Sequence, residues 1–134
     1  MSNKNLIIDA YTDERSSALL YETMAEVEKD PRIADVYRRI AKTELRHAEK
    51  WAARAKEAGM TPPEYKPSWR TRTLVRLGKR FGPAMILPAI QSMEQTGTAA
   101  YAQMEQTMGM AAEEQSHSRL LNVVTRTVRG GVDG

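Results

Sequence analysis

A Glu-x-x-His unit that occurs twice is the feature that most constrains this sequence. Glu44 and His47 form the first unit, and Glu114 and His117 form the second. The chain has 2 histidines, so every histidine belongs to such a unit. A spacing of three residues places both side chains on one face of an α-helix, about one turn apart. Helices that bind metal ions in a bundle core present a carboxylate and an imidazole in this way.

A Glu-x6-Tyr motif precedes each unit. In the first half of the chain this motif runs from Glu14 to Tyr21, and in the second half it runs from Glu94 to Tyr101. Seven residues are two helical turns, so each glutamate shares a helix face with its tyrosine. The chain therefore consists of two pseudo-repeats, and we expect each to form a helical hairpin, the second shorter than the first.

The composition excludes several classes of protein. With Cys 0, the chain has no disulfides, no thiolate zinc site, no iron–sulfur cluster and no attached rubredoxin-type iron site. The net charge of +3 gives no argument for a nucleic-acid partner. No apolar run approaches the length that spans a membrane, and the polar start is not a signal peptide. We expect a single domain in the cytoplasm.

Hydrophobic periodicity predicts four long helices. Apolar residues recur at steps of three and four along each of them, the pattern of a bundle helix. The glutamates and histidines of the two repeats fall on these apolar faces. Asp30 and Pro31 separate the first two helices, as an N-cap and a first-turn proline do. The expected helices cover about residues 5–29, 31–58, 83–104 and 110–128.

A basic stretch lies between the two hairpins. Residues 66–80 carry six lysines and arginines, and no acidic residue occurs between Glu64 and Glu94. Apolar residues interleave with these charges: Trp69, Leu74, Leu77 and Phe81. One interpretation is a crossover helix whose apolar side packs on the bundle. The other is a basic amphipathic segment close to an anionic membrane surface.

The fold class that follows is all-α. We expect an antiparallel four-helix bundle over residues 1–129, built of two pseudo-repeated hairpins with a longer connection between the second and third helices. Residues 130–134 are expected to be a linker to a further C-terminal part.

Six ionisable residues on four apolar faces point to a metal site. Any one of them alone is most simply an exposed or satisfied side chain. Burying all of them without cations would cost several kcal/mol per charge, which disfavours a purely structural bundle. Two divalent ions would neutralise four carboxylates, and oxygen and nitrogen donors suit iron or manganese, although zinc would also bind. The candidate ligands are Glu14, Glu44, His47, Glu94, Glu114 and His117.

This order of ligands resembles that of the ferritin-like di-iron carboxylate proteins. The motifs around Glu14 and Glu44 are similar to those of rubrerythrin. The second hairpin resembles the domain that precedes a vacuolar-iron-transporter-type membrane domain in bacterial membrane-bound ferritins. This last resemblance rests on Arg80-Phe-Gly-Pro83, the short second hairpin and the glycine-rich end.

The resemblance implies roles for these residues. The glutamates of the Glu-x-x-His units would bridge two iron ions, the histidines would each bind one, and the earlier glutamates would be terminal ligands. Tyr21 and Tyr101 would hydrogen-bond to the carboxylates, with ordinary core packing as the alternative. Gly97 stands where rubrerythrins usually carry a further glutamate, which leaves a ferroxidase-like site but not their peroxide-linked ligand exchange.

The function implied is oxidation of Fe(II) by oxygen or hydrogen peroxide in iron homeostasis, export or detoxification. The membrane-bound branch would add a linked transporter domain and a place at the cytoplasmic face of the inner membrane. A homodimer is expected. Two alternatives stay open: an iron-sensing module without turnover, and a rubrerythrin-like peroxidase that uses an external electron donor.

Overall fold

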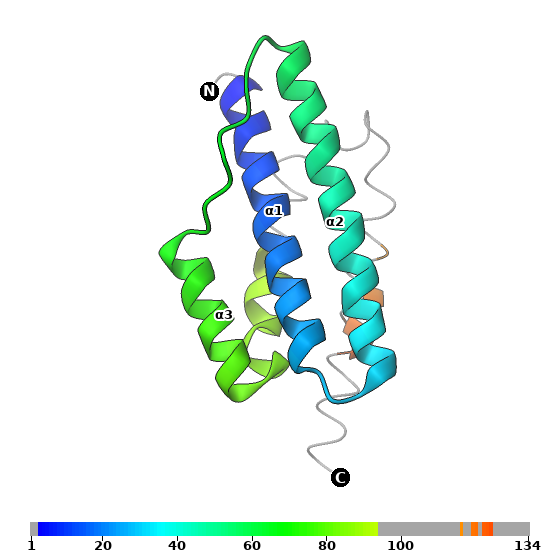
Figure 1. Ribbon diagram of the computed structural model, residues 1–134. Coiled ribbons are helices and arrows are strands. Elements are labelled where there is room, and N and C mark those ends of the chain that lie inside the picture. The colour runs from blue at the N-terminus through cyan, green and yellow to red at the C-terminus, as the bar shows by residue number, and fades with distance from the viewer. Residues whose placement is uncertain (1–2, 94–115, 117–118, 121, 125–134) are drawn as a thin grey trace.

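The computed structural model in Figure 1 describes residues 3–93, 116, 119–120 and 122–124. These residues form helices joined by short connections, which confirms the all-α class. Residues 87–93, 116, 119–120 and 122–124 are also helical. The named elements are α1 (Asn3–Val27), α2 (Pro31–Glu57), α3 (Trp69–Phe81) and the 3-10 turn η1 (Pro83–Met85).

The first two helices form an antiparallel hairpin (Figure 1). The Asp30 side chain caps α2 by accepting a hydrogen bond from the backbone N–H of Arg32 at 2.9 Å. Pro31 occupies the first helical turn, where a missing N–H has no cost. Both predicted helices are therefore confirmed, with ends that differ from the expected ones by no more than two residues.

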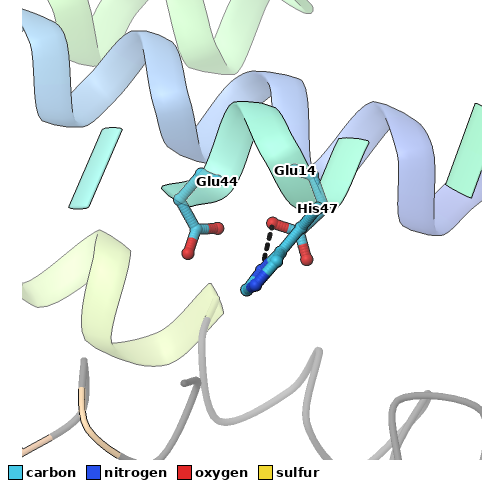
Figure 2. A group of neighbouring side chains, drawn as sticks. All are labelled: Glu14, Glu44 and His47. Carbon is cyan, nitrogen blue, oxygen red and sulfur yellow. Dashed lines mark ion pairs between the residues drawn. The ribbon is translucent and has the colours of Figure 1, made fainter. Parts of the chain in front are cut away.

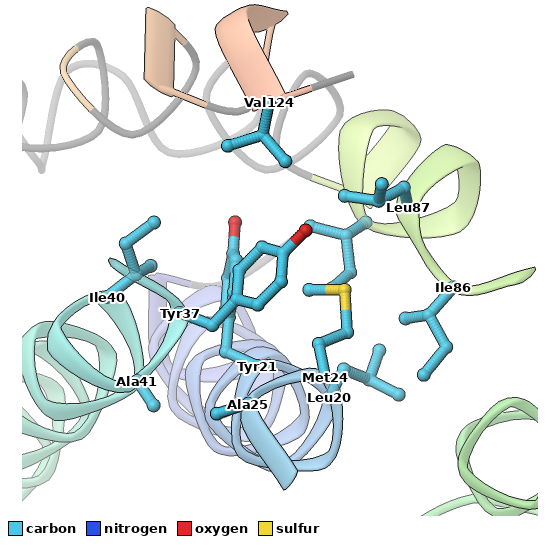
Figure 3. Close-up of a cluster of buried hydrophobic side chains, with 11 residues drawn as sticks. Leu20, Tyr21, Met24, Ala25, Tyr37, Ile40, Ala41, Ile86, Leu87 and Val124 are labelled. Atoms are coloured by element: carbon cyan, nitrogen blue, oxygen red, sulfur yellow. The ribbon is translucent and has the colours of Figure 1, made fainter. Parts of the chain in front are cut away.

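The predicted apolar faces of α1 and α2 form the core. One cluster, which we call the tyrosine cluster, surrounds Tyr21 and Tyr37 (Figure 3) and includes Ile86, Leu87 and Ile90 from the later part of the chain. A second cluster, which we call the tryptophan cluster, contains Ile7, Ala10, Trp51 and Ala55. The helix faces that the periodicity predicted are thus buried at both ends of the hairpin.

A non-helical connection follows α2 and begins the longer connection that was predicted after the second helix. Gly59 takes a positive φ of 80° directly after the C-cap Ala58, a conformation that glycine adopts without steric cost. The connection then crosses back along α1. Tyr65 anchors it there, since its hydroxyl lies 2.8 Å from the hydroxyl of Ser16. The guanidinium of Arg15 also lies 5.1 Å from the centre of the Tyr65 ring.

The basic stretch forms α3, which packs on the side of α1 away from α2 (Figure 1). Thr71 and Gly78 are buried against the core, and Leu74 and Val75 pack on the tyrosine cluster. A helix in this stretch that packs on the core is therefore confirmed. Its aromatic residues do not belong to the packed side, however, because Trp69 is 71% exposed and Phe81 is 60% exposed.

The third long helix begins later than expected. Gly82 takes a positive φ of 98° and ends α3. Residues 83–85 then form a 3-10 turn, and the α-helix starts at 87. The α-helix thus starts a few residues after the predicted start near Pro83, since a 3-10 turn comes first and Ile86, which follows it, lies in the tyrosine cluster. Pro88 consequently lies in the first helical turn, where proline causes no kink.

Part of the predicted bundle lies outside the described residues. This holds for the end of the third helix, most of the fourth, their antiparallel arrangement and the second pseudo-repeat. Of the predicted fourth helix, residues 116, 119–120 and 122–124 are helical, and Val124 packs in the tyrosine cluster. Among the described residues, no helix is both long and apolar enough to cross a membrane.

Candidate metal centre

Three of the six predicted ligands meet between α1 and α2. Glu14 comes from α1, and Glu44 and His47 come from consecutive turns of α2 (Figure 2). All three are buried, with exposed fractions of 8%, 2% and 1%. Since the i, i+3 spacing puts Glu44 and His47 on one face of α2, the antiparallel packing of the two helices is what brings Glu14 to them.

The donor atoms of these residues converge on one small volume. Glu14, Glu44 and His47 each offer one ligand atom, and these atoms all lie within 4.8 Å of one another. His47 Nδ1 is 3.7 Å from Glu14 Oε2 (Figure 2). This separation is longer than a hydrogen bond. Donor atoms around a single metal ion, each about 2.0–2.2 Å from it, stand at separations of this order.

The surroundings of the three side chains are apolar. Along α1, Glu14 lies between Ala10 of the tryptophan cluster and the buried Ala18. Along α2, Glu44 and His47 lie between the tyrosine cluster and Trp51. The polar layer is thus closed at both ends by core side chains, so water has little access to it.

The chemistry of this donor set fits a divalent metal ion. Two carboxylates share a buried volume, where an uncompensated charge costs several kcal/mol. Glu14 Oε2 is buried and accepts no hydrogen bond within the described part of the chain. A cation would satisfy this oxygen and offset the repulsion between the two carboxylates. The residues present therefore match the requirement for metal binding on one side of the predicted site.

Two buried tyrosines lie on the faces that carry the ligands. Tyr21 is fully buried, and its ring centre is 6.4 Å from that of Tyr37 at a tilt of 40°. Both hydroxyls point toward the side on which Val124 and Leu87 lie (Figure 3). The hydrogen bond from Tyr21 to a carboxylate stays a prediction.

Tyr37 is a buried tyrosine that was not among the predicted site residues. Its hydroxyl is buried and makes no hydrogen bond within the described residues. Burial first, and then the negative charge of Glu28, raise the pKa of Tyr37 far above its usual value. The one sequence feature that could have marked Tyr37 as a site residue is its position seven residues before Glu44, on the same helix face. Such a spacing cannot separate a functional tyrosine from a packing one.

The other predicted site residues lie outside the described residues. These are the ligands Glu94, Glu114 and His117, the tyrosine Tyr101, and Gly97, where the sequence departs from the rubrerythrin pattern. The structure therefore brings three predicted ligands together and leaves the other three as predictions.

The helical fold and the buried Glu-Glu-His cluster define a class, that of helical domains with a carboxylate–imidazole metal site. The chain matches the family model described as rubrerythrin over residues 5–129. The chain therefore belongs to the rubrerythrin family. Membership implies a di-iron site and an oxidoreductase-type role. Neither the curated proteins nor the solved structures include a significant match to this chain.

Proposed function

We propose that the chain is a di-iron oxidase, which binds two iron ions between its helices and oxidises Fe(II) with oxygen or hydrogen peroxide. The observation that carries this proposal is the convergence of three buried donor atoms within 4.8 Å, contributed by Glu14, Glu44 and His47. The family supports iron as the metal. Manganese and zinc are substitutes that the same oxygen and nitrogen donors would accept.

Sequence spacing supports a second set of ligands. Glu94 stands four residues after Ile90, which is fully buried in the tyrosine cluster. Residues four apart share a helix face. Glu114 and His117 repeat the spacing of the unit whose side chains do converge. We therefore propose these three residues as the ligands that complete the site.

The three described ligands, Glu14, Glu44 and His47, would take part in the proposed chemistry by holding the metal. Bound iron would supply the electrons that reduce oxygen or peroxide. Glu14 and Glu44 would hold the metal through carboxylate oxygens, which stabilise the ferric state. His47 would contribute a neutral ring nitrogen. The apolar clusters above and below exclude water, which strengthens the electrostatic interactions among these groups.

Other parts of the proposal concern the context of the domain. A homodimer, a linked membrane transporter domain and a role in iron export or detoxification rest on the resemblance stated above. A peroxidase with an external electron donor is the second candidate, because the matched family is described as rubrerythrin.

Anaerobic titration with Fe(II) tests the proposal. We expect two irons per chain, and on addition of air or peroxide a new near-ultraviolet band from oxidised iron. Glu44→Ala should lose both the binding and the band, since it removes a buried donor. Glu49→Ala is the matched control, because Glu49 is an exposed glutamate of α2.

The outcomes separate the candidates. Repeated oxidation of added Fe(II) supports the oxidase. Turnover that depends strictly on an added electron donor would instead identify the peroxidase. Stoichiometric binding without turnover would leave an iron sensor. Tight binding of zinc alone, with no iron, would contradict all three iron-based functions.

A further inference from the structure

We propose that the outward face of α3 docks on an anionic lipid membrane surface. This inference goes beyond the metal site and does not depend on it. It rests on the orientation of the helix, its positive charges, which form no ion pair within the described residues, and the exposed aromatic residues at its two ends.

The orientation of α3 separates two faces. Thr71 and Gly78 are buried, and Leu74 packs on the tyrosine cluster. The opposite face presents Trp69, Arg72, Arg76 and Arg80 at steps of three, four and four, so they form one row along the helix. All four side chains are exposed. In Figure 1, α3 forms one edge of the described part of the molecule, with α1 on its other side.

The outward face is strongly basic. Five of the 13 residues of α3 are arginine or lysine, and none is acidic. None of these five residues forms an ion pair within the described part of the chain. By contrast, Arg38 and Arg39 of α2 are both paired with Asp35. The charge of α3 is therefore available to an anionic partner. The five residues are Arg70, Arg72, Arg76, Lys79 and Arg80.

Exposed apolar side chains flank this charge. Trp69 at the start of α3 is 71% exposed, Phe81 at its end is 60% exposed, and Met85 just beyond is 43% exposed. Trp69 and Phe81 are about 18 Å apart along the helix axis at 1.5 Å per residue. Burying them together requires a broad partner rather than a pocket.

A lipid surface matches this combination better than a nucleic acid does. Arginines are attracted to anionic headgroups, and tryptophan and phenylalanine favour the boundary between headgroups and acyl chains. Phe81 and Met85 would bury apolar surface by entering that boundary. A methionine, by contrast, makes no favourable polar contact with a phosphate backbone. The apolar side of α3 is already packed on α1. The contact with the membrane would therefore be peripheral, and it would be made by the positive charges and by the exposed apolar side chains.

The experiment measures binding of the full chain to vesicles. The probes are vesicles of phosphatidylcholine alone and of phosphatidylcholine with about 30% phosphatidylglycerol, a fraction chosen to give a strongly negative surface. We expect sedimentation with the anionic vesicles only, and weaker binding at higher salt. Tryptophan fluorescence should shift to the blue on binding. Trp69→Phe should bind without this shift, because the remaining Trp51 is fully buried.

Charge variants locate the contact. The triple variant Arg72→Gln, Arg76→Gln, Arg80→Gln should bind anionic vesicles roughly a hundredfold more weakly, at about fivefold for each basic residue. The matched control removes three exposed positive charges from α2, with Lys42→Gln, Lys50→Gln and Lys56→Gln. It should retain binding close to that of the parent. Circular dichroism checks that both variants keep their helices.

Three results would overturn the proposal. The first is no salt-sensitive binding to the anionic vesicles. The second is an equal loss of binding in the α2 control, which would mean that only net charge matters. The third is binding of a single-stranded oligonucleotide through α3 without binding to vesicles, which would make this face a nucleic-acid surface. Iron binding is measured separately, so failure here leaves the oxidase proposal untouched.

Discussion

The buried phenol of Tyr37 shows how one residue links packing to pH dependence. The ring is fully buried in the tyrosine cluster, and the hydroxyl has no hydrogen bond within the described residues. Burial and the nearby negative charge of Glu28 raise its pKa, so the folded chain holds the phenol neutral at alkaline pH. In the unfolded chain, a tyrosine ionises near pH 10.

We predict that Tyr37→Phe lessens the loss of stability at high pH. Above about pH 10 the unfolded chain binds fewer protons than the folded one, so the free energy of unfolding falls as pH rises. For one such tyrosine the loss is about 1.4 kcal/mol at pH 11. Urea unfolding of parent and variant from pH 8 to 11 measures the difference.

Near neutral pH the same substitution should change stability by less than about 1 kcal/mol, since it removes a buried hydroxyl without a described partner. Parallel stability curves for the two proteins across the whole pH range would contradict the prediction, because they would mean that Tyr37 ionises equally in both states.

At the scale of elements, the contact between α3 and the chain after it depends on Gly78. A Cβ built at this position would overlap Ile86, with Cγ1 of that residue at only 2.8 Å. Ile86 is fully buried in the tyrosine cluster and cannot move outward freely. The missing side chain thus lets α3 approach the segment that leads into the third helix.

We predict that Gly78→Ala destabilises the protein, although alanine favours helix. Overpacking against Ile86 should cost about 1–3 kcal/mol, and the gain in helix propensity offsets about 1 kcal/mol of this. Denaturant unfolding gives the net change. In an Ile86→Ala background the clash is absent, so the same substitution should become neutral or stabilising. An identical loss in both backgrounds would rule out this contact as the cause.

On the scale of the whole molecule, a polar layer lies between two apolar clusters. The tyrosine and tryptophan clusters hold α1 against α2 by burial of apolar surface. Glu14 and Glu44 bring two negative charges into the layer between them. A bound metal ion would turn this repulsion into a cross-link between the helices, and its binding free energy would add to stability.

We predict that metal ions no longer raise the stability of the Glu44→Gln variant. For the parent, Fe(II) under anaerobic conditions, or Zn²⁺, should raise the melting temperature, with about 2.7 kcal/mol gained at a hundredfold excess over Kd. The variant should lose this gain. Its metal-free melting temperature should equal or exceed that of the parent, because one of two neighbouring charges is gone.

Glu49→Gln on the exposed side of α2 is the control and should respond to metal like the parent. Differential scanning calorimetry on metal-free and metal-loaded samples provides the comparison. A metal-dependent gain that survives in Glu44→Gln would place the metal elsewhere on the chain.

Local patterns accounted for much of the fold and for half of the site. The apolar periodicity placed α1 and α2, and the Asp30-Pro31 pair placed the turn between them, because helix faces and caps depend on residues a few positions apart. The Glu-x-x-His spacing placed Glu44 beside His47 for the same reason. These features follow from the sequence by itself.

Only the tertiary structure decided which faces meet. It set Glu14 Oε2 at 3.7 Å from His47 Nδ1, across two helices and 33 positions of sequence. It also delayed the third helix to residue 87, buried Gly78 against Ile86 and left Trp69 exposed. Each of these depends on contacts between distant segments, and a local pattern cannot encode them because the same amphipathic helix can pack against different partners at different angles.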